Sequence, residues 1–252
     1  MDRQHLSKDL RLGVNLDHLV TIREARHTPY PDLIEAIRVA ESAGADGITI
    51  HLREDRRHIQ TRDVYNARTA VSTSLNLEMS VSDEMVDIAK DVKPDYCCLV
   101  PERREELTTE GGLDVQANMA RIQQACRALS SRGIKVSLFV EPAIPTIDVV
   151  AEIGAPIIEL HTGAYANATG TEIENELKRL IRATNYATDK GLQVNAGHGL
   201  HYHNVGPIAA IQQIQELNIG HSIIARALFT GLGNATAAMK AAMEQAPSRK
   251  DS

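Results

Sequence analysis

SAGADGITIHL, residues Ser42–Leu52, contains the turn and the strand on which the fold prediction rests. The residues before it, Asp32–Ala43, carry apolar side chains at helical spacing, and SAGADG is a glycine-containing turn signal. GITIH, which follows, is an aliphatic run of strand length. A helix, a turn and a short buried strand in this order are typical of a parallel α/β sheet.

The same unit recurs along the chain on both sides of this stretch. Turn signals such as KPD, SRGIK, IGAP and DKGL introduce further apolar runs. The predicted strands are Leu12–Leu16, Gly47–His51, Leu75–Met79, Tyr96–Val100, Lys135–Val140, Pro156–His161, Leu192–Ala196 and Leu217–Gly220. The predicted helices are Asp32–Ala43, Asp83–Asp91, Val115–Ser131, Thr146–Ile153, Glu172–Lys190 and Ile223–Gln245. Eight such units predict an α/β fold, a (β/α)8 TIM barrel, with a doubly wound open sheet as the alternative.

The composition fits one barrel domain over residues 1–252, with residues 1–10 as an N-terminal extension and 247–252 as a frayed tail. Aromatic residues make up only 3% of the chain, which favours an aliphatic core. The formal net charge of -6 argues against a nucleic-acid-binding protein. The chain shows no secretory signal and no long apolar run, so we expect a cytoplasmic protein that binds no membrane. The cysteines lack CxxC spacing and are predicted to be buried and reduced: Cys97, Cys98 and Cys126.

Polar residues occupy the carboxyl ends of nearly all predicted strands, which is where a barrel forms its active site. In chain order they are Asn15, Asp17, His18, His51, Arg53, Glu78, Glu102, Glu141, Glu159, His161, Asn195, His198 and His221. Each of them, taken alone, could be a structural ion-pair or hydrogen-bond partner. Their convergence at one rim favours a site for proton transfer, because neighbouring titratable groups shift one another's pKa values.

Arginines and glycines near the same rim predict binding sites for small anions. Arg26 and Arg53 could each bind a carboxylate or a phosphate. Gly199 and Gly220 follow the seventh and eighth strands, where barrels most often hold phosphate on backbone N–H groups. Two connections are longer than barrel closure requires and are predicted lid or clamp loops: His18–Tyr30 and Pro101–Gly112.

Other kinds of catalytic site find less support. The sequence contains no HExxH motif, no nucleophile elbow, no P-loop and no dinucleotide fingerprint, and no lysine stands at the carboxyl end of a predicted strand. His201 and His203 are expected to organise their loop. A non-catalytic sensor of phosphorylated metabolites stays an alternative. So does a metal-dependent barrel hydrolase with the ligands Asp17, His18, His161 and His198.

Seven motifs resemble those of the pyridoxine 5'-phosphate synthase family, and they cover residues 13–232 in order. They are GVNLDHLVTIREAR, ADGITIHLREDRRHI, NLEMS, KPDYCCLVPERREELTTEGGLD, IELHTGAYA, VNAGHGLHYHNV and ELNIGHSIIARALFTGL. The resemblance implies a (β/α)8 barrel with extra helices, assembled as a homo-octamer built from dimers. It also implies a transferase of vitamin B6 biosynthesis that uses no cofactor and no metal. Its two substrates would be 1-deoxyxylulose 5-phosphate and 3-amino-2-oxopropyl phosphate, condensed to pyridoxine 5'-phosphate, phosphate and water.

The resemblance also implies roles for individual residues. His51 and Glu78 match the family's proton acceptors, His198 its proton donor, and Glu159 its transition-state stabiliser. The matching contacts to the deoxyxylulose phosphate are Asp17, His18, Arg53, His58 and Thr108. The matching contacts to the aminoketone phosphate are Asn15, Arg26, Gly199, Gly220 and His221.

Overall fold

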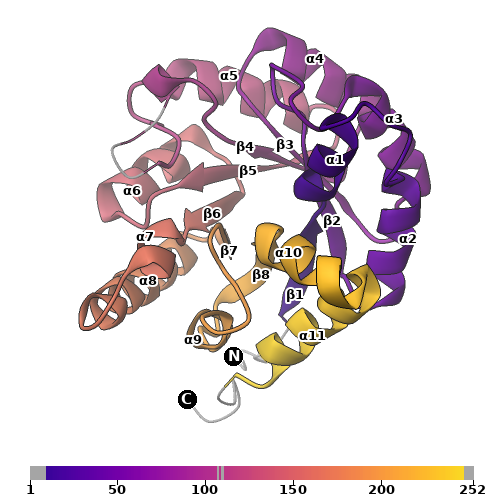
Figure 1. Cartoon of the computed structure of the whole chain (residues 1–252). Coiled ribbons are helices and arrows are strands. Elements are labelled where there is room, and N and C mark those ends of the chain that lie inside the picture. The colour runs from indigo at the N-terminus through magenta and orange to yellow at the C-terminus, as the bar shows by residue number, and fades with distance from the viewer. Residues whose placement is uncertain (1–9, 107, 109–110, 247–252) are drawn as a thin grey trace, which may run out of the picture.

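Eight parallel strands form a closed barrel in the order β1 to β8, with β8 pairing back onto β1 (Figure 1). The structure is a computed structural model that describes residues 10–106, 108 and 111–246. Apart from Leu10, the predicted N-terminal extension lies outside these residues, as does the predicted tail. Closure excludes the doubly wound open sheet and confirms the (β/α)8 TIM barrel.

The strand predictions are correct to within a residue at most ends. The strands are β1 (Arg11–Asn15), β2 (Gly47–His51), β3 (Leu75–Met79), β4 (Tyr96–Leu99), β5 (Lys135–Val140), β6 (Ile157–His161), β7 (Gln193–Gly197) and β8 (Ile214–Ile219). The start predicted for the last strand was wrong, since β8 begins at Ile214 rather than Leu217. The polar residues Gln215 and Glu216 interrupt the apolar run there, and Glu216 is buried inside the barrel.

Eleven α-helices accompany these strands within the described part of the chain. They are α1 (Asp17–Glu24), α2 (Leu33–Ser42), α3 (Thr61–Ala70), α4 (Asp83–Val92), α5 (Met119–Ser130), α6 (Ile144–Ile153), α7 (Gly163–Asn167), α8 (Glu172–Asp189), α9 (Val205–Ala209), α10 (His221–Thr230) and α11 (Leu232–Glu244). Local signals set their ends. The Asp32 carboxylate accepts the N–H of Glu35 at the start of α2, and Gly154 ends α6 at a φ of 84°.

Two helix predictions need correction. The connection His18–Tyr30, predicted to be a loop, is largely helix α1, which lies inside the ring of outer helices in Figure 1. The stretch Ile223–Gln245, predicted as one helix, is the pair α10 and α11. Gly231 separates them at a φ of 79°, a left-handed conformation that favours glycine and breaks the helix.

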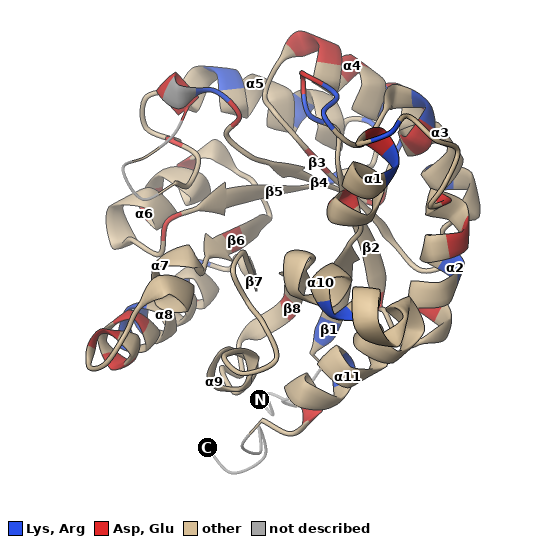
Figure 2. Ribbon diagram, viewed as in Figure 1, with Lys and Arg blue, Asp and Glu red and all other residues tan. Residues whose placement is uncertain are grey.

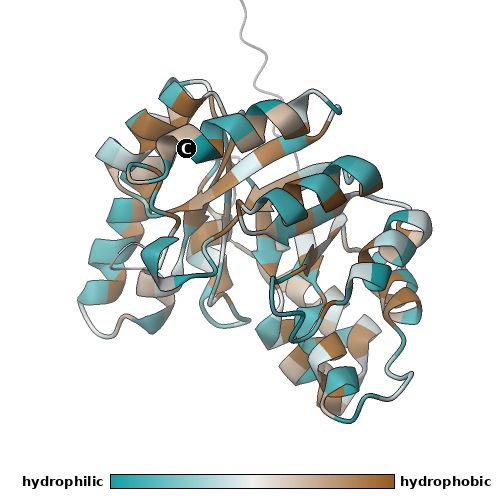
Figure 3. Ribbon diagram, turned by 90° about the horizontal axis from the view of Figure 1, so that it is seen from above, coloured by the Kyte–Doolittle hydropathy of each residue, from teal (hydrophilic) through white to brown (hydrophobic). Residues whose placement is uncertain are grey.

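The core is aliphatic, as predicted. Fully buried Leu, Ile and Val side chains from the strands pack against the inner faces of the helices, and Figure 3 shows hydrophobic residues concentrated there. The three cysteines are buried, and burial raises the pKa of each thiol, to about 12 for Cys126, so the thiols stay protonated. Among the described helices, none combines the length and the hydropathy needed to cross a membrane.

Charged residues lie mainly on the outer helices, but some acidic residues lie on the strands themselves, on β6 and β8 (Figure 2). The inside of the barrel is therefore partly polar. Thr49 and Asn218 are hydrogen-bonded to each other there, with 3.0 Å between Thr49 Oγ1 and Asn218 Oδ1, and both are almost fully buried. Gly13 leaves room for this contact, because a Cβ at residue 13 would lie 2.1 Å from Asn218 Oδ1. These polar side chains lie inside the barrel, beneath the residues at the strand ends.

Candidate active site at the carboxyl ends of the strands

His51 is the centre of one group of side chains at this rim. It ends β2, where its backbone N–H donates to Asp17 Oδ1 over 2.8 Å. Its ring Nε2 lies 2.8 Å from Glu102 Oε1, and its Nδ1 lies 3.8 Å from Glu78 Oε2. Three carboxyl groups, from the ends of β1, β3 and β4, thus surround one imidazole.

Two of these carboxyl groups are held away from water. Burial raises the pKa of Asp17 to about 6, against the lowering influence of His51 and Arg53. Burial also raises the pKa of Glu78 well above its usual range, and the nearby carboxyls of Asp17 and Glu159 add to this. Groups whose pKa values are moved towards neutrality can exchange protons with a substrate at physiological pH.

Glu102 behaves differently. Its Oε1 faces His51, and its Oε2 accepts the backbone N–H of Glu54 over 2.9 Å. Burial alone would raise its pKa, but these two hydrogen bonds outweigh burial and lower it. Glu102 is therefore an ionised partner that orients the His51 ring.

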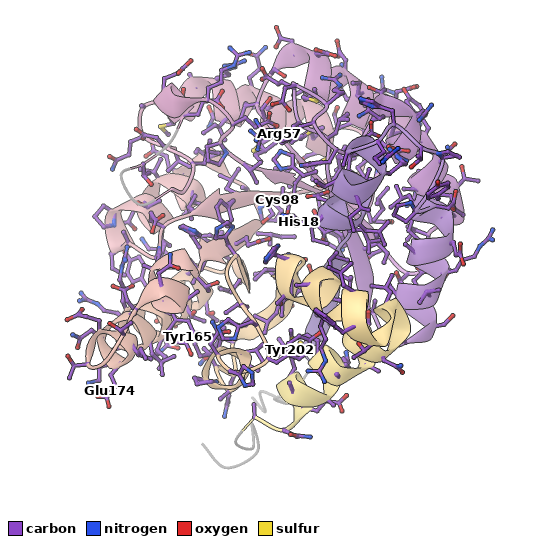
Figure 4. The ribbon with its side chains drawn as sticks, viewed as in Figure 1. His18, Arg57, Cys98, Tyr165, Glu174 and Tyr202 are labelled. Carbon is purple, nitrogen blue, oxygen red and sulfur yellow. The ribbon has the colours of Figure 1, made fainter. Side chains whose placement is uncertain are left out.

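Glu159 lies deeper, on β6 inside the barrel, and is 3% exposed. Its Oε2 accepts the side-chain N–H of Asn218 over 2.8 Å and lies 3.8 Å from Cys98 Sγ. Burial raises the pKa of Glu159 to about 7; the hydrogen bond from Asn218 opposes this rise, and the charge of Glu216 adds to it. Cys98 is labelled near the centre of the ring of helices in Figure 4.

His198 follows β7 in an uncommon backbone conformation. Its φ is 81°, and the Thr162 hydroxyl donates to its carbonyl oxygen over 2.6 Å. Its ring packs edge-on against His161, with 5.0 Å between the ring centroids, and lies 6.3 Å from the ring of Phe139. Burial lowers the pKa of His198, and the nearby His161 and His18 lower it further. A left-handed histidine held by a neighbouring segment is strain of the kind found at functional sites.

His161 is fixed in turn by Glu141. Its Nδ1 lies 2.8 Å from Glu141 Oε1, which also accepts the backbone N–H of Gly112 over 2.9 Å. Gly112 ends the predicted loop Pro101–Gly112. Glu141 therefore joins the end of this loop to an imidazole at the rim.

The ends of β1 and β8 meet on the other side of the rim. The rings of His18 and His221 pack edge-on, with centroids 4.9 Å apart, and burial lowers the pKa of His18. Figure 4 labels His18 near the centre of the ring of helices. Gly220 precedes α10 and lies so close to Asn15 that a Cβ at residue 220 would be 2.9 Å from Asn15 Cβ. Gly220 thus packs its backbone against Asn15, where no side chain fits, directly before the N-terminus of α10.

The predicted anion contacts differ in how well the structure prepares them. Arg53 Nε is buried without a hydrogen-bond partner among the described residues and lies 3.8 Å from Asp55 Oδ1. His58 lies 6.2 Å from His51 between ring centroids, and burial lowers its pKa to about 4. Arg26 is exposed in the turn after α1, and within the described chain its side chain has no hydrogen bond or ion pair.

The hydroxyl of Thr108 is used within its own loop. Thr108 Oγ1 accepts the backbone N–H groups of Gly111 and Gly112 over 3.2 and 3.0 Å. Thr109 and Glu110, which follow Thr108, lie outside the described residues. Gly199 has a φ of 79°, and a Cβ there would lie 2.6 Å from Ala166 Cβ, so no larger residue fits without displacement.

Sequence reasoning placed Glu102 and Glu141 at strand ends but did not find their roles. Each forms a carboxylate–imidazole pair with a histidine from another strand, which spacing along the chain does not reveal. Asn218 was missed altogether, although it lies in a predicted strand and polar residues inside such a run are the signal for it. The loop histidines behave as expected, since His203 donates its backbone N–H to His201 Nδ1 over 3.2 Å.

One part of the rim could also hold a cation. Ligand atoms of Asp17, His51 and Glu78 all lie within 4.8 Å of one another. Within the described residues this group differs from the predicted hydrolase set, sharing only Asp17 with it. His161 pairs with Glu141 instead, and His18 packs against His221.

Comparison with solved structures bears on the fold of this chain. Two solved barrels share the fold alone. The thiamine phosphate pyrophosphorylase of Pyrococcus furiosus has a TM-score of 0.63 and 15% identity over 97% of this chain and 100% of its own. A phosphoribosyl anthranilate isomerase has a TM-score of 0.57 and 13% identity over 93% of this chain and 98% of its own.

Much closer similarity comes from curated proteins. The pyridoxine 5'-phosphate synthase of Thioalkalivibrio sulfidiphilus (strain HL-EbGR7) is 60% identical over 94% of this chain and 97% of its own. The pyridoxine 5'-phosphate synthase of Pseudoalteromonas translucida (strain TAC 125) is 59% identical over 95% of this chain and 99% of its own. The family model described as pyridoxal phosphate biosynthesis protein PdxJ matches residues 12–245. The chain belongs to the PdxJ family of pyridoxal phosphate biosynthesis proteins.

Proposed function

We propose that this chain is a pyridoxine 5'-phosphate synthase, a transferase of vitamin B6 biosynthesis. It condenses 1-deoxyxylulose 5-phosphate with 3-amino-2-oxopropyl phosphate and releases pyridoxine 5'-phosphate, phosphate and water. The observation that carries this proposal is the 60% identity to a synthase over 94% of the chain. The cluster of buried carboxyls and imidazoles at the rim supports it, since every step of this condensation moves a proton.

His51 and Glu78 act as proton acceptors. Glu102 holds the Nε2 side of the His51 ring, so Nδ1 faces Glu78 and the space above the strands. A carboxyl whose pKa is raised by burial is a stronger base when ionised, which suits Glu78 for abstraction of a proton during imine formation and elimination.

His198 acts as the proton donor to a leaving oxygen. Its pKa is lowered by burial and by two nearby imidazoles, which disfavours the protonated ring. A bound phosphate next to Gly199 brings negative charge beside the ring and raises that pKa again. His198 would therefore gain its proton when the substrate binds and could then pass it to a leaving oxygen.

Two phosphate-binding sites, called grips below, hold the two substrates next to each other. The deoxyxylulose phosphate contacts Asp17, His18, Arg53, His58 and Thr108. Arg53 Nε, which has no hydrogen bond within the described part of the chain, supports this part of the assignment. The aminoketone phosphate contacts Asn15, Arg26, Gly199, Gly220 and His221, where the open N-terminus of α10 offers backbone N–H groups. Holding both substrates converts a rare encounter into a positioned one.

Glu159 stabilises the transition state from below the reacting atoms. Its pKa of about 7 lets it shift between charged and neutral forms, and Asn218 holds its Oε2. The enzyme is one barrel domain that works in the cytoplasm as a homo-oligomer, an octamer assembled from dimers. It uses no cofactor and no metal, and it binds neither nucleic acid nor membranes.

A single assay tests this function. The purified protein is treated with a chelator and mixed with both substrates, and pyridoxine 5'-phosphate and free phosphate are followed together. We expect the two products in equal amounts. Absence of both products would contradict the synthase. Activity that returns only with an added divalent cation would instead assign Asp17, His51 and Glu78 to a metal site.

A further inference from the structure

Glu141 and His161 form a buried carboxylate–imidazole pair to which the family resemblance gives no role. Glu141 directly follows β5 and His161 ends β6, and both are less than a tenth exposed. Glu141 Oε1 lies 2.8 Å from Nδ1 and, as a carboxylate, accepts the hydrogen bond, which fixes both the rotation of the His161 ring and the nitrogen that carries the proton. The ring also lies against Gly163, where a Cβ would be 2.4 Å from His161 Nε2. The other carboxylate oxygen of Glu141, Oε2, lies 3.5 Å from Arg179 Nη2, so Glu141 pairs with a cation as well as with the ring.

The His161 ring is one wall of the position that His198 occupies. The two rings meet edge to face at 64°, with their centroids 5.0 Å apart. Phe139 lies 5.0 Å from His161 and 6.3 Å from His198, so it supports the same wall. Thr162 holds the backbone, since its hydroxyl donates to the carbonyl oxygens of His198 and Gly197. One short segment after β6 thus holds both the side chain and the main chain of His198.

We propose that Glu141 and His161 are positioning residues for His198: Glu141 fixes the His161 ring, and that ring fixes the orientation of the His198 imidazole. The inference rests on the proposed function, in which His198 donates a proton. His198 needs such support because it lies one residue beyond the end of β7, follows a glycine and is only partly covered by its neighbours, so its own strand does not hold its side chain. In a catalytic triad, a buried carboxylate orients the catalytic histidine directly. Here the imidazole of His161 lies between the carboxylate of Glu141 and the catalytic His198.

Two substitutions test the roles of Glu141 and His161 separately. Glu141→Gln keeps an oxygen for the Gly112 N–H and the ring of His161, but removes the charge that fixes the ring. His161→Asn keeps an N–H donor near Glu141 but removes the ring that touches His198. We expect each to lower kcat about 10- to 100-fold and to leave both KM values within about threefold. Glu41→Gln is the matched control, because Glu41 accepts hydrogen bonds from Ser72 and Thr73 far from the rim, and its kcat should stay unchanged.

A double-mutant cycle decides whether the pair acts through His198. In a His198→Asn background, Glu141→Gln and His161→Asn should cost almost nothing further in kcat. The same loss in both backgrounds would overturn the proposal, as would an unchanged kcat in the single variants. A rise in KM alone would also overturn it, because the pair would then act on substrate binding through Gly112 and its loop.

A second measurement does not depend on turnover. In protein with 15N-labelled histidine, the ring signals of His198, assigned by their loss in His198→Asn, should shift or broaden in Glu141→Gln and stay unchanged in Glu41→Gln. Unchanged His198 signals in folded Glu141→Gln would overturn the proposal. If the wild-type protein makes no product, the proposed function fails by itself, and the ring signals still show whether Glu141 orients His198.

Discussion

Glu102 Oε1 lies 2.8 Å from His51 Nε2, and the other carboxylate oxygen of Glu102 accepts the backbone N–H of Glu54. The carboxylate is thereby fixed at both oxygens. Since an ionised carboxylate has no proton to donate, its hydrogen bond with His51 requires the proton to be on Nε2. The neutral His51 ring then carries its proton on Nε2 and presents Nδ1, which faces Glu78, as the basic nitrogen. Glu102, which follows β4, therefore sets the tautomer of His51, the proposed base at the end of β2.

Glu102→Gln tests this relationship. The amide can place an N–H where the carboxylate oxygen was, which favours the proton on Nδ1 and removes the basic nitrogen from the site. We expect kcat to fall by about 100-fold or more with little change in KM. Steady-state kinetics would show this, with Glu84→Gln as the control because Glu84 pairs with Arg56 at the surface. Equal kcat in the two variants would contradict the assignment.

Glu78→Gln should separate binding from turnover. The glutamine keeps an acceptor for the Asn15 side chain, 3.3 Å away in the wild type, but cannot take a proton. We expect titration calorimetry to give nearly unchanged affinities for each substrate, while product formation falls by about 100-fold or more. Full activity in this variant would remove Glu78 from the mechanism.

Glu159→Gln should stabilise the protein at alkaline pH while it lowers activity. Burial raises the folded-state pKa of Glu159 from 4.5 to about 7. Between these values the folded state keeps the proton that the unfolded state has lost, so wild-type stability falls as pH rises from about 4.5 to 7 and stays lowered above that. The variant lacks this group, and its Oε1 can still accept from Asn218.

The measurement is the free energy of unfolding by denaturant at pH 5 and at pH 8. We expect Glu159→Gln to gain on the order of 2 kcal/mol over the wild type at pH 8 and much less at pH 5. A gain of equal size at both pH values would mean that packing, and not the ionisation of Glu159, causes the difference in stability between the variant and the wild type. The Glu41→Gln variant is a suitable control, because hydrogen bonds from Ser72 and Thr73 lower the pKa of Glu41 despite its partial burial, and it should not gain stability at pH 8.

The pair Arg23 and Asp63 shows why part of the fold escaped prediction. Arg23 Nη1 lies 2.9 Å from Asp63 Oδ1, and the pair joins α1 to α3. The buried positions of α1 are Asp17, Val20 and Arg23, so two of its three inward residues are charged. Apolar periodicity, which predicted helices such as α2, α4 and α8, is absent from such a helix. The ion pair that replaces it joins residues 40 positions apart, and a single sequence does not reveal that contact.

The strands were predictable for the opposite reason. A strand such as β2, in which all five residues are buried, reads as a continuous aliphatic run between turn signals. The rim residues followed from the strands, because parallel closure brings all carboxyl ends to one edge. The pairing among them did not follow, since Glu102 reaches past β3 to His51, while Glu141 reaches its neighbour on β6. Order along the chain predicts the set of residues but not the bonds between them.

Gly220→Ala tests the proposed grip on the aminoketone phosphate. A Cβ at residue 220 would lie 2.9 Å from Asn15 Cβ and 3.1 Å from the Asn15 backbone oxygen, so Asn15 or the start of α10 must move. Both belong to the same proposed grip, and the displacement would also place a methyl group where the backbone N–H groups meet the phosphate.

We expect the KM for 3-amino-2-oxopropyl phosphate to rise about tenfold or more, with a smaller change for 1-deoxyxylulose 5-phosphate. Gly206→Ala is the matched control: it lies in α9, a Cβ there meets nothing within 4 Å, and both KM values should stay as in the wild type. If Gly220→Ala raised only the KM for the deoxyxylulose phosphate, the two grips would have to be exchanged. The open backbone before α10 would then belong to the other substrate.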